Sequence, residues 1–169
     1  KYSILNFRIW YTYSDREIPP SILQTNSKAQ QRDIITRYSA EWKHSKRNTE
    51  YALRSAFFRE KLNYNDDFII QSSENKCNSL INEATFENNL TSNHLFQVGV
   101  NHTYSIADSS SNYIKASVSR FSIFAFYRYH STNEKIEFSL SGRKEFSSLN
   151  NSPVTFSGGM NYSPVKSIL

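Results

Sequence analysis

Two runs of period-two alternation, joined by a short polar turn, constrain the fold of this chain more than any other feature. From Arg32 to Lys43, mostly apolar side chains occupy every second position, and mostly polar or charged side chains lie between them. The alternation resumes from Tyr51 to Glu60, after the turn His44–Thr49. Successive side chains of a strand point to opposite faces, so each run predicts a strand with one apolar and one polar face. The short turn predicts that they pair as an antiparallel hairpin.

The same alternation recurs along the rest of the chain. The predicted strands cover residues 2–14, 32–43, 51–62, 80–90, 96–104, 120–129, 136–143 and 154–162. Only four glycines and four prolines occur, and aromatic residues make up 15% of the chain, which favours strands over helices. A hydrophobic content of 38% argues against a parallel α/β core, whose strands are buried on both faces. The sequence therefore predicts an all-β, antiparallel up-and-down meander of about eight strands over residues 1–169.

The predicted connections alternate between long and short. Long loops are expected at Asp15–Gln31, Asn63–Ser79, Asp108–Asn112 and Ser147–Pro153. Short turns are expected at His44–Asn48, Thr91–Asn93, Ser131–Asn133 and Ser163–Pro164. Transmembrane β-barrels alternate long extracellular loops with short periplasmic turns, and they carry aromatic residues at both membrane interfaces. Trp42 and Tyr51 lie near a short turn and Tyr11 and Tyr13 near a long loop, so the meander is predicted to be part of a larger transmembrane β-barrel.

The sequence contains no convincing catalytic or metal-binding pattern. His44, His94, His102 and His130 lack metal-ligand spacing, and Cys77 is the single cysteine, which excludes an internal disulfide and a cysteine-based zinc site. Asp66-Asp67 is interpreted as solvated loop charge, and Cys77 as an incidental thiol in a polar loop. We therefore predict no enzyme activity, no catalytic residue, no metal ligand and no cofactor.

Charge and hydropathy exclude two further classes of protein. The formal net charge is +5, but the twenty basic residues are interleaved with fifteen acidic ones and form no stripe, so nucleic acid is not an expected partner. The longest apolar run, Ile123–Tyr127, is far shorter than the roughly 18 residues of a spanning helix. The absence of an initiating methionine favours a piece of a longer protein.

Two segments carry a resemblance to a known family. These are Tyr11-Thr12-Tyr13-Ser14-Asp15-Arg16-Glu17-Ile18-Pro19-Pro20, followed by Ser27-Lys28-Ala29 and the strand at Asp33, and Met160-Asn161-Tyr162-Ser163-Pro164-Val165-Lys166-Ser167-Ile168-Leu169. The first resembles the Arg-x-Ile-Pro segment, and the second a periplasmic turn, in the barrel domain of TonB-dependent outer-membrane receptors, especially cobalamin and siderophore receptors of Bacteroidetes type. The chain departs from the family because neither its N-terminal plug nor its TonB-contacting segment is visible.

The resemblance implies a fragment of a bacterial outer-membrane transporter that imports a scarce ligand such as cobalamin or a ferric siderophore. Its partners would be outer-membrane lipid, TonB through the missing N-terminal part, and a small-molecule ligand, alone or together with a surface lipoprotein. The loops Asp15–Gln31 and Asn63–Ser79 would then face outside. No plug residue has a counterpart here, so the ligand-binding residues stay unknown.

The alternation is also compatible with two other interpretations. Eight strands can close into a complete small outer-membrane barrel of structural or adhesin type, whose interior is filled by side chains. A soluble β-sandwich that binds glycan or protein would use the apolar face as the core between two sheets.

Overall fold

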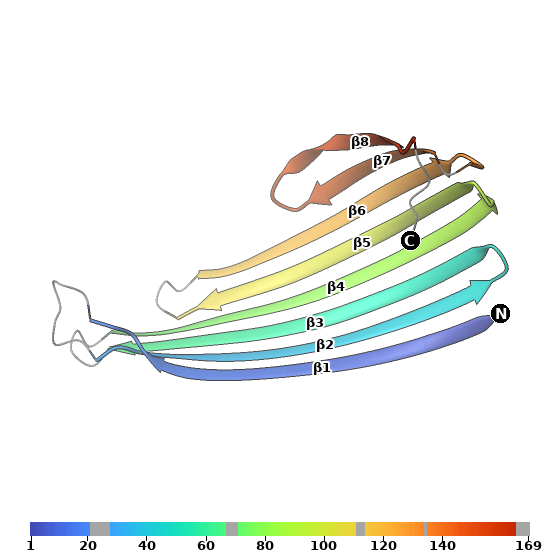
Figure 1. Ribbon diagram of the computed structural model, residues 1–169. Helices are drawn as coiled ribbons and strands as arrows, with labels where there is room; N and C mark the ends of the chain where they lie inside the picture. Colours follow the sequence, from blue (N-terminus) through green and yellow to red (C-terminus); the bar gives the residue numbers. More distant parts are fainter. Residues whose placement is uncertain (21–27, 67–70, 111–113, 134, 165–169) are drawn as a thin grey trace.

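The computed structural model describes residues 1–20, 28–66, 71–110, 114–133 and 135–164, which form one antiparallel sheet of eight strands (Figure 1). The strands are β1 (Tyr2–Glu17), β2 (Gln30–Lys46), β3 (Thr49–Asp66), β4 (Gln71–Thr91), β5 (His94–Ser109), β6 (Ile114–His130), β7 (Ile136–Ser147) and β8 (Asn151–Tyr162). Each strand pairs with the strands before and after it in the chain. The predicted all-β meander of eight strands is confirmed.

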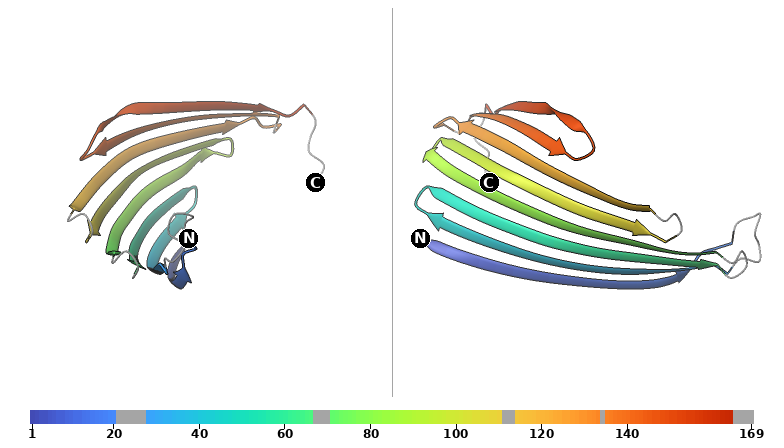
Figure 2. Two further views of the ribbon diagram at one scale, coloured as in Figure 1. Left: turned by 90° about the vertical axis from the view of Figure 1, so that its left-hand side faces the viewer. Right: turned by 180° about the vertical axis from the view of Figure 1, so that it is seen from behind.

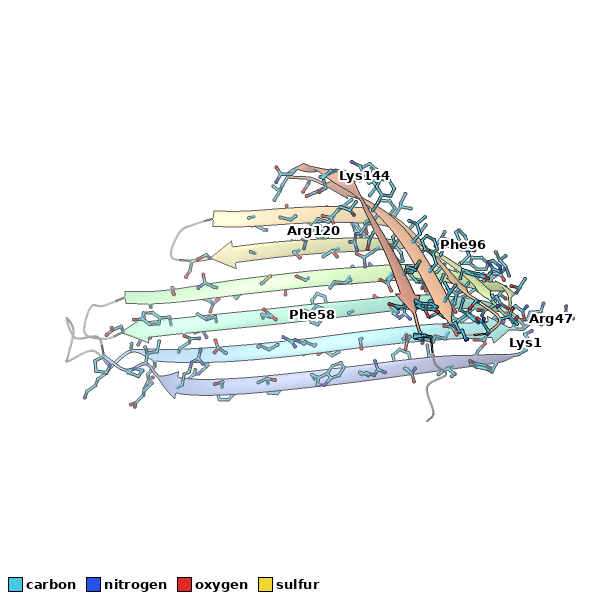
Figure 3. All side chains as sticks on the ribbon, turned by 45° about the horizontal axis from the view of Figure 1, so that its top comes forward. Lys1, Arg47, Phe58, Phe96, Arg120 and Lys144 are labelled. Atoms are coloured by element: carbon cyan, nitrogen blue, oxygen red, sulfur yellow. The ribbon has the colours of Figure 1, made fainter. Side chains whose placement is uncertain are left out.

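The sheet does not close on itself, because β1 and β8 are its two edges and do not pair with each other among the described residues. Figure 2 shows that the strands follow an arc, with β1 and β8 at its two ends. Lys1 and Arg47 lie at the same end of the sheet, where β2 turns into β3 (Figure 3). No helix in the described part of the chain is both long and apolar enough to cross a membrane.

The strands are longer than predicted at the end opposite Arg47. Strand β3 continues to Asp66 and β4 begins at Gln71, so the expected long loop Asn63–Ser79 is wrong, and its residues 67–70 lie outside the described part. In this region side chains on both faces are polar, which removes the period-two signal. Backbone N–H and C=O groups still pair across the strands, whatever the side chains are.

The strict alternation of connection lengths is also wrong. Asp108 and Ser109 belong to β5, and Pro153 lies within β8, which leaves only residues 148–150 between β7 and β8. The turn between β6 and β7 covers residues 131–135 and is therefore the longer of the two. Asp15–Glu17 extends β1, and residues 21–27 of the expected Asp15–Gln31 loop lie outside the described part.

The sheet has almost no apolar core. The only hydrophobic residues buried in the described part are Ala29 and Ala52. The accessible surface is 12398 Å², whereas a compact monomer of this mass would expose about 8,600 Å². Large apolar side chains are left on the surface, with Phe7, Ile9 and Phe156 exposed by 70% or more. A single layer of strands cannot bury its apolar face by itself.

Candidate functional site

The two faces of the sheet differ in both chemistry and crowding. Along β3, Tyr51, Leu53 and Phe57 lie on the apolar face and are between 37% and 52% exposed, whereas Ala52 on the other face is 2% exposed. Side chains on the concave side of a curved single layer converge, and those on the convex side spread apart. The convex face is therefore the apolar one, and the concave face carries most of the paired charges.

The apolar face forms a band that has nearly the same width on many strands. Its large side chains fall within nine-residue windows on four strands: Leu5–Tyr13 on β1, Ile34–Trp42 on β2, Phe121–Tyr129 on β6 and Val154–Tyr162 on β8. On β5 the window is Phe96–Tyr104, with Ile106 two residues beyond it on the same face. We call the convex-face residues of these windows and their neighbours on β3, β4 and β7 the apolar band. A nine-residue window measures about 27 Å along a strand, and a transmembrane strand needs about 9–11 residues.

The apolar band runs obliquely across the strands. The centre of the β1 window, Ile9, lies in the hydrogen-bonding row that contains Phe57 of β3, whereas the centre of the β8 window, Gly158, lies in the row of Thr49. From β1 to β8 the centre of the band thus moves by about eight residues along the strands over seven strand-to-strand steps. At typical strand spacings, the band makes an angle of about 40° with the direction perpendicular to the strands. Strands in barrels tilt by roughly 35–45° from the barrel axis.

One polar pair interrupts the middle of the apolar band. Ser55 of β3 and Asn82 of β4 are register partners on the convex face, and the Ser55 hydroxyl donates to the Asn82 amide oxygen at 2.8 Å. Small side chains, Ala40 and Ala84, line a shallow hollow around them. His102 of β5 continues the same row as the register partner of Asn82, so the interruption is a small polar patch inside the apolar band. The hydrogen bond satisfies part of the polarity of this patch.

The concave face carries a cross-strand charge network. The Arg54 guanidinium lies between two carboxylates, with Nε 2.8 Å from Glu41 Oε1 and Nη1 2.8 Å from Glu83 Oε1. Lys43 Nζ lies 3.6 Å from Glu41 Oε1, and the Asn6 amide donates to Glu41 at 3.4 Å. This one network links β1, β2, β3 and β4, and within it the two carboxylates offset the two cations.

Aromatic side chains fill part of the concave face between the charges. The Arg37 guanidinium lies 5.5 Å from the ring centre of Phe58 and 3.4 Å from Glu60 Oε1. The Phe124 ring covers Gly99 so closely that a Cβ atom at Gly99 would lie 2.3 Å from Phe124 Cζ. Figure 3 places Phe58 and Arg120 over the middle of the sheet, far from the turn at Arg47.

A hollow of about 620 Å³ lies at the end of the sheet opposite Arg47. Its concave-face lining combines apolar Ile35 and Leu62 with polar Asp33 and Asn75, and it includes Cys77. Cys77 lies within β4, with Sγ 3.9 Å from Ser79 Oγ, so the prediction of a loop thiol is wrong. The sequence around Cys77 shows no apolar–polar alternation, because both faces of β4 are polar here. The lining of this hollow is mainly apolar, with a few hydrogen-bonding groups among the apolar side chains.

A cationic cluster lies on the convex face just beyond the apolar band. Lys61 and Lys76 are direct register partners on β3 and β4, and both pair with the Glu74 carboxylate, Lys61 at 2.6 Å. These two ammonium groups hold the pKa of Glu74, outside the apolar band, at about 2. Arg59 precedes Lys61 on the same face and forms no ion pair with the described residues. We call Arg59, Lys61, Glu74 and Lys76 the cationic cluster.

A similar but balanced pair lies beyond the band on β1 and β2. Arg32 Nη2 lies 3.0 Å from Asp15 Oδ2, and the Tyr13 hydroxyl donates to the same oxygen at 3.1 Å. Both interactions lower the pKa of Asp15, with the Arg32 hydrogen bond as the main cause. This pair is neutral overall, whereas the cationic cluster has three cations around one carboxylate.

The histidines do not form a metal site. His44 Nδ1 lies 2.7 Å from Ser3 Oγ, His94 Nδ1 lies 2.6 Å from the Tyr127 hydroxyl, and His102 Nε2 lies 3.1 Å from Ser119 Oγ. No group of three or more His, Cys, Asp or Glu side chains suited to a metal ion occurs in the ranges that the structure describes.

The interpretation of Asp66 as solvated charge is wrong, and Asp67 lies outside the described residues. Asp66 ends β3 and is 1% exposed. The polar composition around it suggested a loop open to solvent, whereas the strand continues to this residue. Burial depends on what packs over the strand end, which residue type alone does not indicate.

These surfaces define a single-layer antiparallel sheet with an exposed, oblique apolar band on the convex face and a crowded polar concave face. The sequence matches no protein-family model, and no curated protein matches it. The contrast between the two faces is the feature of this chain that points to a function.

Proposed function

We propose that this chain forms part of the wall of a transmembrane β-barrel in the bacterial outer membrane. The observation that carries the proposal is that the apolar side chains lie on the convex face, which is the more exposed of the two. A soluble protein buries such a surface, and contiguous apolar patches of this extent are rare on soluble monomers. Hydrocarbon chains of a bilayer would cover the apolar band, and the polar concave face would line the interior.

The width and slope of the band support the same proposal. The nine residues of each window are about the number that a transmembrane strand needs. The band angle of about 40° agrees with the tilt of strands in barrels. A soluble sandwich has no need for a common band width across so many strands. It would also require a second sheet over the apolar face, and the described residues form one sheet.

The free edges of β1 and β8 require further strands. An open sheet edge inside a bilayer leaves unpaired N–H and C=O groups, each costing several kcal/mol. The arc in Figure 2 keeps β1 and β8 apart, which favours the wall of a wider barrel over a closed eight-stranded one of structural or adhesin type. In this proposal β1 and β8 each pair with strands from the remainder of a longer protein.

The more specific proposal is a TonB-dependent receptor that imports a scarce ligand, such as cobalamin or a ferric siderophore. It is supported by the Tyr11–Pro20 segment and by the Met160–Leu169 segment, which resemble corresponding segments of these barrels. A plug and a TonB-contacting segment would come from the missing N-terminal part. The hollow near Cys77 would then lie along the interior wall at the outer end of the barrel.

The decisive experiment compares this chain in plain buffer and in detergent micelles, using far-UV circular dichroism and analytical ultracentrifugation. We expect strand signal with a monodisperse species only in micelles, because detergent covers the apolar band. Polarised infrared spectroscopy of oriented bilayers should then give a strand tilt of about 40°. A monodisperse β-rich species in plain buffer would contradict the membrane proposal.

A further inference from the structure

On the convex face, the cationic cluster brings three cations together with a single carboxylate as ion-pair partner among the described residues. On the concave face, Arg54 has two carboxylate partners at 2.8 Å. In the cationic cluster, Lys61 and Lys76 share only Glu74, and Arg59 has no ion pair with any described residue. Lysines placed directly opposite each other on neighbouring strands repel. Asp108 and Lys115 continue the row of Lys61 and Lys76 on the next two strands, and their formal charges offset each other. The arrangement therefore leaves a local excess of two positive charges.

The position of the cluster identifies the kind of anion that fits it. Arg59 follows Phe57 by two residues on the convex face of β3, and Phe57 belongs to the apolar band. A ligand at the cluster would thus contact cations and, immediately beside them, an apolar surface. A free anion uses only the first of these, whereas a lipid uses both, since its headgroup carries charge and its chains are apolar.

We propose that the cationic cluster binds the phosphate-bearing headgroup of an anionic membrane lipid, whose acyl chains lie against the apolar band. The proposal rests on the proposed membrane location and adds the class of lipid and the residues that recognise it. The guanidinium of Arg59 and the ammonium groups of Lys61 and Lys76 surround the phosphate. Glu74 pairs with both lysines and offsets one of the three positive charges.

The test measures how the chain partitions into vesicles of phosphatidylcholine with and without phosphatidylglycerol, by sedimentation with the vesicles. The test variant is Arg59→Gln/Lys61→Gln/Lys76→Gln. Its matched control, Arg8→Gln/Arg120→Gln/Arg128→Gln, removes three cations from the concave face, where none of the three has an ion pair among the described residues. Each cation near an anionic surface contributes about fivefold in affinity at low salt.

We expect the unmodified chain and the control variant to prefer the anionic vesicles, and the test variant to lose at least tenfold of that preference. Glu74→Gln should increase the preference several-fold, because it frees both lysines without unfolding the strand pair. Equal losses in the test and control variants would overturn the proposal, since net charge would then explain the preference. An unchanged preference in the test variant would overturn it as well.

Two further outcomes distinguish failure of the headgroup proposal from failure of the proposed membrane location. A chain that binds both kinds of vesicle equally overturns only the headgroup proposal, whereas a chain that binds neither and is monodisperse and β-rich in plain buffer overturns the proposed membrane location too. Inorganic phosphate and sodium chloride at equal ionic strength should weaken anionic binding equally. Selective displacement by inorganic phosphate would assign the cluster to a free anion and overturn the lipid proposal.

Discussion

Leu53 and Arg54 are neighbours in the chain, yet β3 places them in opposite surroundings. Leu53 is 52% exposed on the convex face, while Arg54 on the concave face is held by Glu41 and Glu83 at 2.8 Å. In a soluble sheet the leucine would be buried and the arginine would extend into water. The difference arises because the described strands form a single layer, which leaves the apolar face of this sheet without a cover of its own.

The largest effect is expected from a charge placed in the apolar band. Val100 lies at the centre of the β5 window, and the adjacent Asn101 lies on the polar face. Val100→Arg should destabilise the membrane-inserted chain by about 2–4 kcal/mol, the cost of a cation near the bilayer midplane. Urea unfolding in lipid vesicles measures the difference.

The matched control for that substitution is Asn101→Arg, one residue away on the concave face. It should change the free energy of unfolding by less than about 1 kcal/mol, because polar residues and water surround this position. Similar losses in the two variants would show that the two faces are equivalent and would contradict a membrane-facing band.

The next effect comes from steric crowding on the concave face. Gly99→Ala places a Cβ atom 2.3 Å from Phe124 Cζ, so the ring must move. We expect a loss of about 1–3 kcal/mol, as is usual when a tightly packed site is overfilled. Gly158→Ala on the convex face meets only ordinary contacts of 3.7 Å or more and should be tolerated.

A compensating substitution tests whether crowding causes the loss of stability in Gly99→Ala. Combining Gly99→Ala with Phe124→Leu should recover part of the lost stability, since the smaller side chain leaves room for the new methyl group. Equal losses for Gly99→Ala and Gly158→Ala in micelle unfolding would show that crowding by the Phe124 ring is not the cause of the loss at Gly99.

A smaller effect is expected when the charge network of the concave face is broken. Arg54→Met removes the shared partner of Glu41 and Glu83 and leaves two carboxylates facing each other across β3. Because the Arg54 side chain is 40% exposed, the loss should be about 1 kcal/mol. A double-mutant cycle with Glu83→Gln measures the coupling, and Arg128→Met, which removes no ion pair among the described residues, is the control.

The smallest effect is expected at the polar interruption of the apolar band. Replacing both members of the pair, as Ser55→Val/Asn82→Leu, removes a hydrogen bond together with both polar groups, which is usually neutral or stabilising. We expect a gain below about 1 kcal/mol in micelles. Glu83→Leu, next to Asn82 but on the concave face, should instead destabilise the chain, because Arg54 loses an acceptor. A clear loss in the double variant would give the pair a structural role of its own.

Much of the fold could be predicted from the alternation alone, and the failures share one cause. The runs around Ile34, Val98 and Ile123 placed strands correctly because one side of each run is apolar. Around Asn75 and Cys77 both faces are polar, so the sequence there resembles a loop although β4 extends through it. The ion pair of Lys61 with Glu74 could not be predicted, since it depends on the register of β3 against β4 in this region.

The sequence by itself determined the number of strands, their order as a meander and which residues share a face, because the side-chain period of a strand is two. Only the tertiary structure decided that the apolar face is convex, that its band crosses the strands obliquely and that Arg54 lies between two carboxylates. Curvature and register accumulate over all eight strands through backbone hydrogen bonds. No single strand's sequence carries them.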